Sequence, residues 1–221
     1  MEHTATLGHV QAQTLATNRL IRNTYTLLAL TLAFSAAMAG VSILFHLPFI
    51  SPWITLIGYF GLLFLTAKFR NSGMGIVCVF ALTGFMGITL GPILSFYLAT
   101  PNGSQLVMQA LGATAFIFFA LSAYALVSRK DFSFIRGFLF VGILVAFFAG
   151  LAALFFNLPT LSLAVSAAFV LLSSGLILYQ TSAIVNGGET NYIMATVTLY
   201  VSLYNLFMSL LHLLRVFTGD D

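Results

Sequence analysis

The polar residues with the most regular spacing lie in the last apolar segment of the chain. In sequence order they are Asn191, Thr198, Ser202, Asn205, Ser209 and His212, at steps of seven, four, three, four and three. A helix brings residues at these steps to one face. A polar stripe facing lipid would be unfavourable, so we expect this helix to lie inside a bundle and to hydrogen-bond its neighbours. The pattern fits two roles, contacts that hold helices together or a polar path along the helix.

Catalysis by these residues finds little support in the sequence. Ser209 and His212 lie one helical turn apart, but no nucleophile motif surrounds the serine and the histidine lies near the end of the segment. The apolar segments contain no Asp, which intramembrane aspartyl proteolysis would need. The four histidines show no metal-ligand spacing and lack carboxylate companions. We therefore predict that the protein is not an enzyme and uses no metal or cofactor.

The chain contains seven apolar segments, the last of which carries the polar stripe, and they predict an all-α membrane protein. Hydrophobic residues make up 60% of the chain and charged residues 6%, whereas a soluble domain has about a quarter of its residues charged. A helix needs about 20 residues to cross ~30 Å of hydrocarbon. The predicted spans are Thr24–Phe45, Ser51–Ala67, Met74–Leu98, Gln105–Val127, Phe134–Phe156, Thr160–Val185 and Asn191–Leu214.

The chain outside the spans is short. Residues 1–22 are rich in Gln, Thr and Ala, and we expect a disordered cytoplasmic tail there. Residues 23–217 form the predicted transmembrane domain, and residues 218–221 a short C-terminal tail. The N-terminal tail could be an inert extension or a segment that a protease engages.

The basic residues predict the orientation of the chain in the membrane. Those that precede the sixth span all fall in the N-terminal tail and the second and fourth loops, namely Arg19, Arg22, Lys68, Arg70, Arg129, Lys130 and Arg136. The first, third and fifth loops have none, so the N-terminus is predicted to be cytoplasmic and the C-terminus periplasmic. These short clusters form no basic face, so we expect no nucleic-acid partner.

The third span contains a motif for close helix packing. Gly87 and Gly91 form a GxxxG pair, which lets another helix backbone approach in lipid. Pro92 follows directly; it removes one amide donor and is expected to kink or break the helix. The motif fits either close packing with a bend or a bend that gates a passage.

Several longer motifs resemble the signature of the Bax inhibitor 1 family. They are Gly75-Ile-Val, Gly87-x-x-Leu90-Gly91-Pro92-x-Leu94, Ala110 and Thr114-Ala115-x-x-Phe118. Further stretches resemble its bacterial YccA branch, namely Arg22-Asn-Thr-Tyr25, Leu30-Thr-Leu-Ala-Phe-Ser-Ala36, Asn186-Gly-Gly-Glu-Thr-Asn-Tyr192 and Leu199-Tyr-Val-Ser-Leu-Tyr-Asn205. The resemblance covers residues 22–214 and implies seven helices with the last one central.

The resemblance also implies a function. The YccA branch is known as a modulator of FtsH, an ATP-dependent protease of the bacterial inner membrane. A non-enzymatic regulator that binds FtsH and restrains its proteolysis of membrane proteins is thus expected, with no small-molecule substrate. A small-solute transporter is less favoured, because the bend at Pro92 is the one candidate site for a solute.

The alternative function is a calcium or other cation leak. Leak members of the family carry two acidic residues, one on each of the last two helices, that share a proton and close the pore. The aligned positions here are Gln180 and Ser202. Neither side chain ionises, so that pH-sensing mechanism is not expected in this chain, although the two side chains could still hydrogen-bond and fix one closed packing.

Overall fold

The computed structural model describes residues 2–218, and the side chains of residues 15–218. Its helices are α1 (Glu2–Leu44), α2 (Pro52–Phe69), α3 (Gly73–Leu98), α4 (Gly103–Ser128), α5 (Arg136–Phe155), α6 (Pro159–Val185) and α7 (Tyr192–Phe217), with a short 3-10 helix η1 (Ser133–Ile135) before α5. Seven of these are long and apolar enough to cross a membrane. The prediction of a seven-helix membrane protein is confirmed, and apart from the start of α1 the boundaries agree within three residues.

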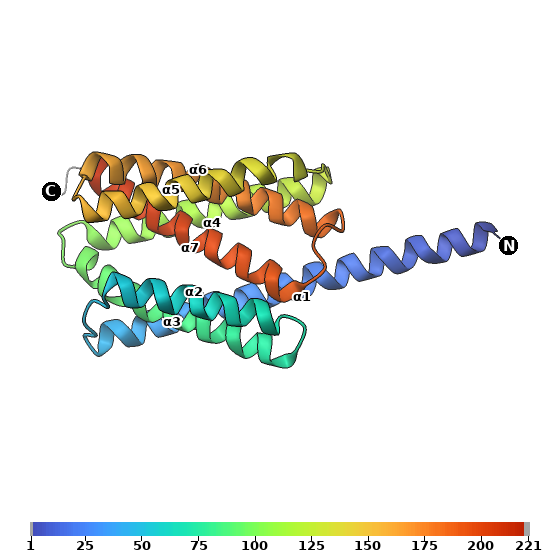
Figure 1. Ribbon diagram of the computed structural model, residues 1–221, viewed down its shortest axis with the longest axis horizontal. Coiled ribbons are helices and arrows are strands. Elements are labelled where there is room, and N and C mark those ends of the chain that lie inside the picture. Colours follow the sequence, from blue (N-terminus) through green and yellow to red (C-terminus); the bar gives the residue numbers. More distant parts are fainter. Residues whose placement is uncertain (1, 219–221) are drawn as a thin grey trace.

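The start of α1 differs from the sequence expectation. The helix begins at Glu2, whereas a disordered tail was expected over residues 1–22. Residues 10–22 contain no Gly or Pro, and Ala, Leu, Gln and Arg favour helix, so the membrane helix continues outward. With 43 residues, α1 is about 65 Å long and projects well beyond the bundle (Figure 1). Of the expected C-terminal tail, only Thr218 lies within the described residues.

The helices form two groups with α7 between them. Helices α1, α2 and α3 pack together on one side, and α4, α5 and α6 on the other (Figure 1). Helix α7 crosses between the groups and contacts every other helix except α5. Half of its membrane-spanning window is buried (50%), against 6% of that in α2. The last helix is therefore the central one, as expected.

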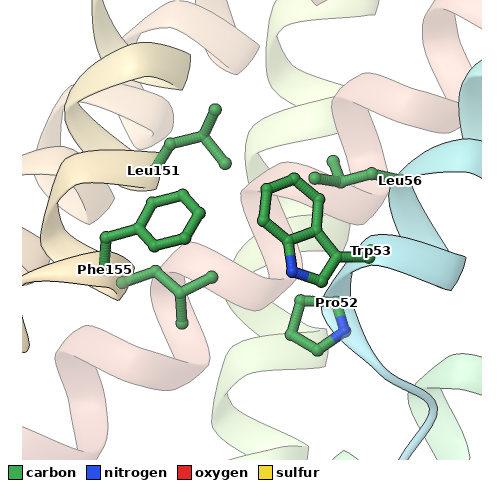
Figure 2. Close-up of a pocket in the computed structure, with 6 residues that line it drawn as sticks. Pro52, Trp53, Leu56, Leu151 and Phe155 are labelled. Atoms are coloured by element: carbon green, nitrogen blue, oxygen red, sulfur yellow. The ribbon is translucent and has the colours of Figure 1, made fainter.

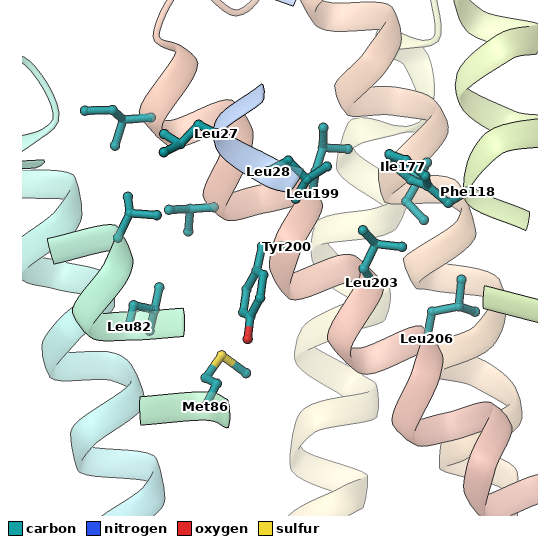
Figure 3. Close-up of a cluster of buried hydrophobic side chains, with 13 residues drawn as sticks. Leu27, Leu28, Leu82, Met86, Phe118, Ile177, Leu199, Tyr200, Leu203 and Leu206 are labelled. Atoms are coloured by element: carbon teal, nitrogen blue, oxygen red, sulfur yellow. The ribbon is translucent and has the colours of Figure 1, made fainter. Parts of the chain in front are cut away.

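The main hydrophobic core forms where the two groups meet α7. Figure 3 shows side chains from α1, α3, α4, α6 and α7 around the middle of the bundle, with Leu82, Ile177 and Leu199 fully buried. Large apolar side chains on the outside stay exposed, such as Phe64 at 68% and Phe138 at 73%. An exterior of this kind suits a surface whose solvent is lipid.

Candidate functional site

The polar stripe of α7 lies inside the bundle, but its hydroxyl groups do not link helices. Ser202 and Ser209 are buried, and Thr198 and Asn205 are half-buried. The Ser202 hydroxyl donates to the carbonyl oxygen of Thr198, one turn earlier, at 2.7 Å. Within residues 15–218 none of these four side chains makes an interhelical hydrogen bond. Ser202 is thus satisfied within its own helix, which lets a polar group occupy an apolar interior.

The interhelical hydrogen bonds of α7 come from a different set of residues. The Tyr200 hydroxyl donates to the carbonyl oxygen of Thr83 on α3 at 3.3 Å and lies 2.6 Å from the Ser35 hydroxyl on α1. One turn earlier, Thr196 donates to the carbonyl oxygens of Thr24 on α1 and of Tyr192 on α7. Tyr200 is 1% exposed and joins three helices. The role of Tyr200 could not be predicted from the sequence, because a tyrosine in an apolar run gives no indication of where its hydroxyl points.

The two ends of the predicted stripe anchor α7 to its neighbours. At the start, the Asn191 side chain accepts a hydrogen bond from the Met194 backbone N–H at 3.0 Å and so caps the helix. Its amide nitrogen donates to the Arg70 carbonyl oxygen and to the Asn71 side chain, in the loop between α2 and α3. An asparagine just before an apolar run is a capping signal that the sequence already contained.

At the other end, His212 bonds a serine on α6. Its ring Nδ1 lies 2.8 Å from the Ser166 hydroxyl, which itself donates to the Ser162 carbonyl oxygen. The pair joins α6 to α7, and which of the two atoms donates depends on the tautomer of the histidine ring. His212 therefore serves an interhelical contact rather than activating Ser209, and the geometry gives no nucleophile–base pair between them.

The contact between α1 and α3 is built around Gly87, Gly91 and Pro92. A Cβ atom at Gly87 would overlap the backbone carbonyl of Ser35, and one at Gly91 would overlap the Ser42 side chain. The two glycines therefore allow the close approach that the GxxxG motif predicts. Helix α3 runs unbroken through the buried Pro92, so of the expected kink or break the break does not occur.

Pro92 is tolerated because α1 supplies the missing donor. Proline has no N–H, so the carbonyl oxygen four residues earlier, at Ile88, has no helical partner. The Ser42 hydroxyl of α1 donates to that oxygen at 2.9 Å. Ser42 is 1% exposed, so this bond is shielded from water. Gly91, Pro92 and Ser42 thus act as one unit, in which the glycine opens the space through which the serine reaches the freed carbonyl.

The comparison with family sequences gives the family. The model described as "Inhibitor of apoptosis-promoting Bax1" matches residues 17–219, which covers all seven spans. The chain belongs to the Bax inhibitor 1 family.

Individual relatives match nine tenths or more of the chain. It is 57% identical over 202 residues to an uncharacterized protein of Pseudomonas aeruginosa, covering 91% of each chain. It is 51% identical over 220 residues to the Escherichia coli protein named "Modulator of FtsH protease YccA", covering 100% of each. An uncharacterized protein of Neisseria meningitidis is 35% identical over 218 residues, covering 95% of this chain and 96% of that one.

Within this Bax inhibitor 1 bundle, the two positions aligned with the acidic pair are both buried. Gln180 on α6 is 5% exposed and Ser202 on α7 is 0% exposed. The Gln180 amide nitrogen has no hydrogen-bond partner among the described residues, and Ser202 bonds its own helix. The structure therefore does not bring these two side chains together by a hydrogen bond.

A small apolar pocket lies between α2 and α5. It encloses about 170 Å³ and is lined by Pro52, Trp53, Leu56, Leu151, Leu154 and Phe155 (Figure 2). The Trp53 and Phe155 ring centroids are 5.4 Å apart, and those of Phe60 and Phe147 are 5.8 Å apart, so aromatic contacts link the two helices. Its lining side chains are all hydrocarbon apart from the indole N–H, so the pocket offers little to recognise a polar solute.

Proposed function

We propose that this protein is a non-enzymatic regulator in a bacterial inner membrane, which binds the FtsH protease and restrains its proteolysis of membrane proteins. The observation that carries the proposal is the 51% identity, over the full length of both chains, to the Escherichia coli protein named modulator of FtsH protease. The alignment covers all seven helices and their loops, and so includes the outer surfaces that a partner would contact.

The arrangement of polar groups supports a binding role over a chemical one. The buried hydroxyls for which the structure gives a partner bond either backbone carbonyls or other bundle residues, as Ser42, Tyr200 and Thr196 do. Among the described residues no three His, Cys, Asp or Glu side chains gather in one place. The buried hydroxyls hold the helices in position, and the outer faces of the bundle remain available to a partner.

Helices α2 and α5 offer the largest faces to a partner within the membrane. The buried shares of their spanning windows are 6% and 17%. Helix α5 packs mainly on α6, and α2 mainly on α3, so both present most of their surface to lipid. Exposed aromatic side chains such as Phe60 and Phe148 lie on these faces. We propose that a membrane helix of the protease complex packs there.

The proposed orientation places the N-terminus in the cytoplasm and the C-terminus in the periplasm. It is supported by seven of the eight Lys and Arg residues, which lie at the end of the bundle that carries the N-terminal extension; Arg215, at the end of α7, is the exception. A reporter that is active only outside the cytoplasm, fused after Asp221, is expected to be active. An inactive fusion on a stably inserted protein would overturn the orientation.

Co-purification tests the proposed partner directly. The tagged protein is solubilised from its native membrane in mild detergent, and FtsH is expected to be retained with it. A tagged membrane protein of similar size and abundance is the control. Retention of equal amounts of FtsH by the control, or of none by this protein in several mild detergents, would count against the proposal.

A cation leak is the alternative function, favoured by one observation. The Gln180 amide is buried without a partner in the described structure, and such a group costs about 1–3 kcal/mol unless something bonds it. A buried N–H donor of that kind could be satisfied by a water molecule in a hydrated path, although as a donor it would not itself coordinate a cation. The lack of a carboxylate at either Gln180 or Ser202 weighs against cation selectivity.

A further inference from the structure

A polar groove lies where α1 leaves the bundle. It has a volume of about 860 Å³ and runs between the outer part of α1 and the start of α7. Its polar lining consists of Asn18, Arg19, Arg22, Asn23, Thr190 and Tyr192. Two leucines, Leu15 and Leu20, complete the α1 side. Neither the helix contacts of the bundle nor the proposed role in proteolysis uses this groove.

The groove lies at the level of the lipid headgroups. Thr24, two residues after Arg22, is fully buried and lies at the start of the uncharged part of α1. Tyr192, on the other wall, is the first residue of α7. Two spans therefore begin at the floor of the groove, and tyrosine is typical of the boundary between hydrocarbon and headgroups.

The groove carries positive charge that the described structure does not neutralise. Arg19 and Arg22 are three residues apart, so they lie on neighbouring positions of one helix face, and both are exposed. Among residues 15–218 no carboxylate forms an ion pair with either. The nearest acid in sequence to the α7 wall, Glu189, uses one carboxylate oxygen to accept the backbone N–H groups of Thr190 and Asn191, each at 2.8 Å.

These features match a phosphodiester. Guanidinium groups bind phosphate oxygens through paired hydrogen bonds, and the side-chain amides of Asn18 and Asn23 add neutral donors beside them. The leucines beside the arginines can pack against the glycerol and the first methylene groups of a lipid. We infer that this groove binds the headgroup of an anionic phospholipid. In the proposed orientation the lipid belongs to the cytoplasmic leaflet, but lipid binding itself does not depend on any interaction with FtsH.

The test measures binding of short-chain phosphatidylglycerol to the purified full-length protein in a zwitterionic detergent. Short-chain phosphatidylcholine and inorganic phosphate are measured in parallel. The Arg19→Gln, Arg22→Gln double variant removes both charges from the groove. The matched control, Lys68→Gln with Arg70→Gln, removes two charges from the end of α2 and the loop that follows it, outside the groove lining.

The unmodified protein is expected to bind phosphatidylglycerol more tightly than phosphatidylcholine. The groove variant is expected to lose about 25-fold in affinity, and the control less than about threefold. An Arg19→Lys, Arg22→Lys variant keeps the charge but not the paired hydrogen bonds, so its affinity is expected to lie between those of the unmodified protein and the groove variant. Thermal unfolding in the same detergent verifies that each variant is folded.

Three results would overturn the inference. Equal losses in the groove variant and the control would mean that only net charge matters. Equal affinity for the two lipids would remove the role of the headgroup charge. Inorganic phosphate that binds as tightly as phosphatidylglycerol would indicate a site for a soluble anion instead of a lipid.

Discussion

The bond from Ser42 to the backbone of α3 makes a prediction that depends on Pro92. The Ser42→Ala substitution removes the hydroxyl that donates to the Ile88 carbonyl oxygen. Because Pro92 has no N–H, that oxygen then has no donor from its own helix. In a Pro92→Ala background, the new backbone N–H at position 92 can donate to Ile88, and Ser42 becomes dispensable.

The expected size follows from the burial of the bond. Interhelical hydrogen bonds in membrane proteins average ~0.6 kcal/mol and reach ~1.7 kcal/mol, and a buried carbonyl left without a donor costs about 1–3 kcal/mol. Ser42 is 1% exposed, so water does not readily replace the hydroxyl. Ser42→Ala is therefore expected to lower the free energy of unfolding by about 1 kcal/mol in the unmodified protein, and by less than ~0.3 kcal/mol in the Pro92→Ala background.

The assay is reversible unfolding in mixed micelles with increasing dodecyl sulfate, followed by circular dichroism for both single variants and the double variant. Ser174→Ala is the control, because that hydroxyl donates to the Val170 carbonyl within the same helix. The double-mutant cycle isolates the coupling between Ser42 and Pro92. An equal effect of Ser42→Ala in both backgrounds would refute the idea that this serine compensates for the proline.

Three further predictions concern the other contacts of the bundle. Gly87→Ala is expected to lower the free energy of unfolding by about 1–3 kcal/mol in the same unfolding assay. Gly112→Ala is the control, because a Cβ atom there meets open space, and it is expected to be neutral or stabilising. Equal effects of the two substitutions would refute the close packing at Gly87. Tyr200→Phe is expected to cost about 1 kcal/mol by releasing its partners on α1 and α3, and an unchanged unfolding curve would contradict that. Because Gln180 and Ser202 do not ionise, calcium flux into liposomes is expected to stay low between about pH 6 and pH 8. The Gln180→Asp, Ser202→Asp variant, if folded and if its two carboxyls face each other, gains pH dependence, since two neighbouring buried carboxyls resist ionising together. A pH-gated leak in the unmodified protein would instead favour the channel.

The positions of the membrane spans could be predicted from the sequence, because one strong physical requirement determines them. A segment inside hydrocarbon must be apolar and helical for about 20 residues, so composition alone locates it. Predicted and observed ends agree closely, as in Met74–Leu98 against Gly73–Leu98. The outward continuation of α1 was missed, because polar residues can form a helix without any apolar periodicity to reveal it.

The contacts of α7 were less predictable, because the helix is buried on most of its circumference. A polar stripe indicates an inward face only when another face meets lipid, and here Thr196 and Tyr200 bond neighbours from outside the stripe. Ser202 satisfies itself within α7, which no spacing rule reveals. The close-packing motif was predictable from Gly87 and Gly91, but the serine that compensates for Pro92 lies 50 residues away and could be found only in the structure.

The proposed restraint of FtsH is tested most directly by the rate at which the protease degrades a membrane protein. Purified FtsH and an integral membrane substrate are reconstituted in liposomes with ATP and increasing amounts of this protein. A seven-helix membrane protein from another family, at equal density, controls for crowding in the bilayer. The degradation rate is expected to fall progressively as this protein is added, and to stay constant with the control. A rate that does not change over a wide range of ratios would contradict the proposed function.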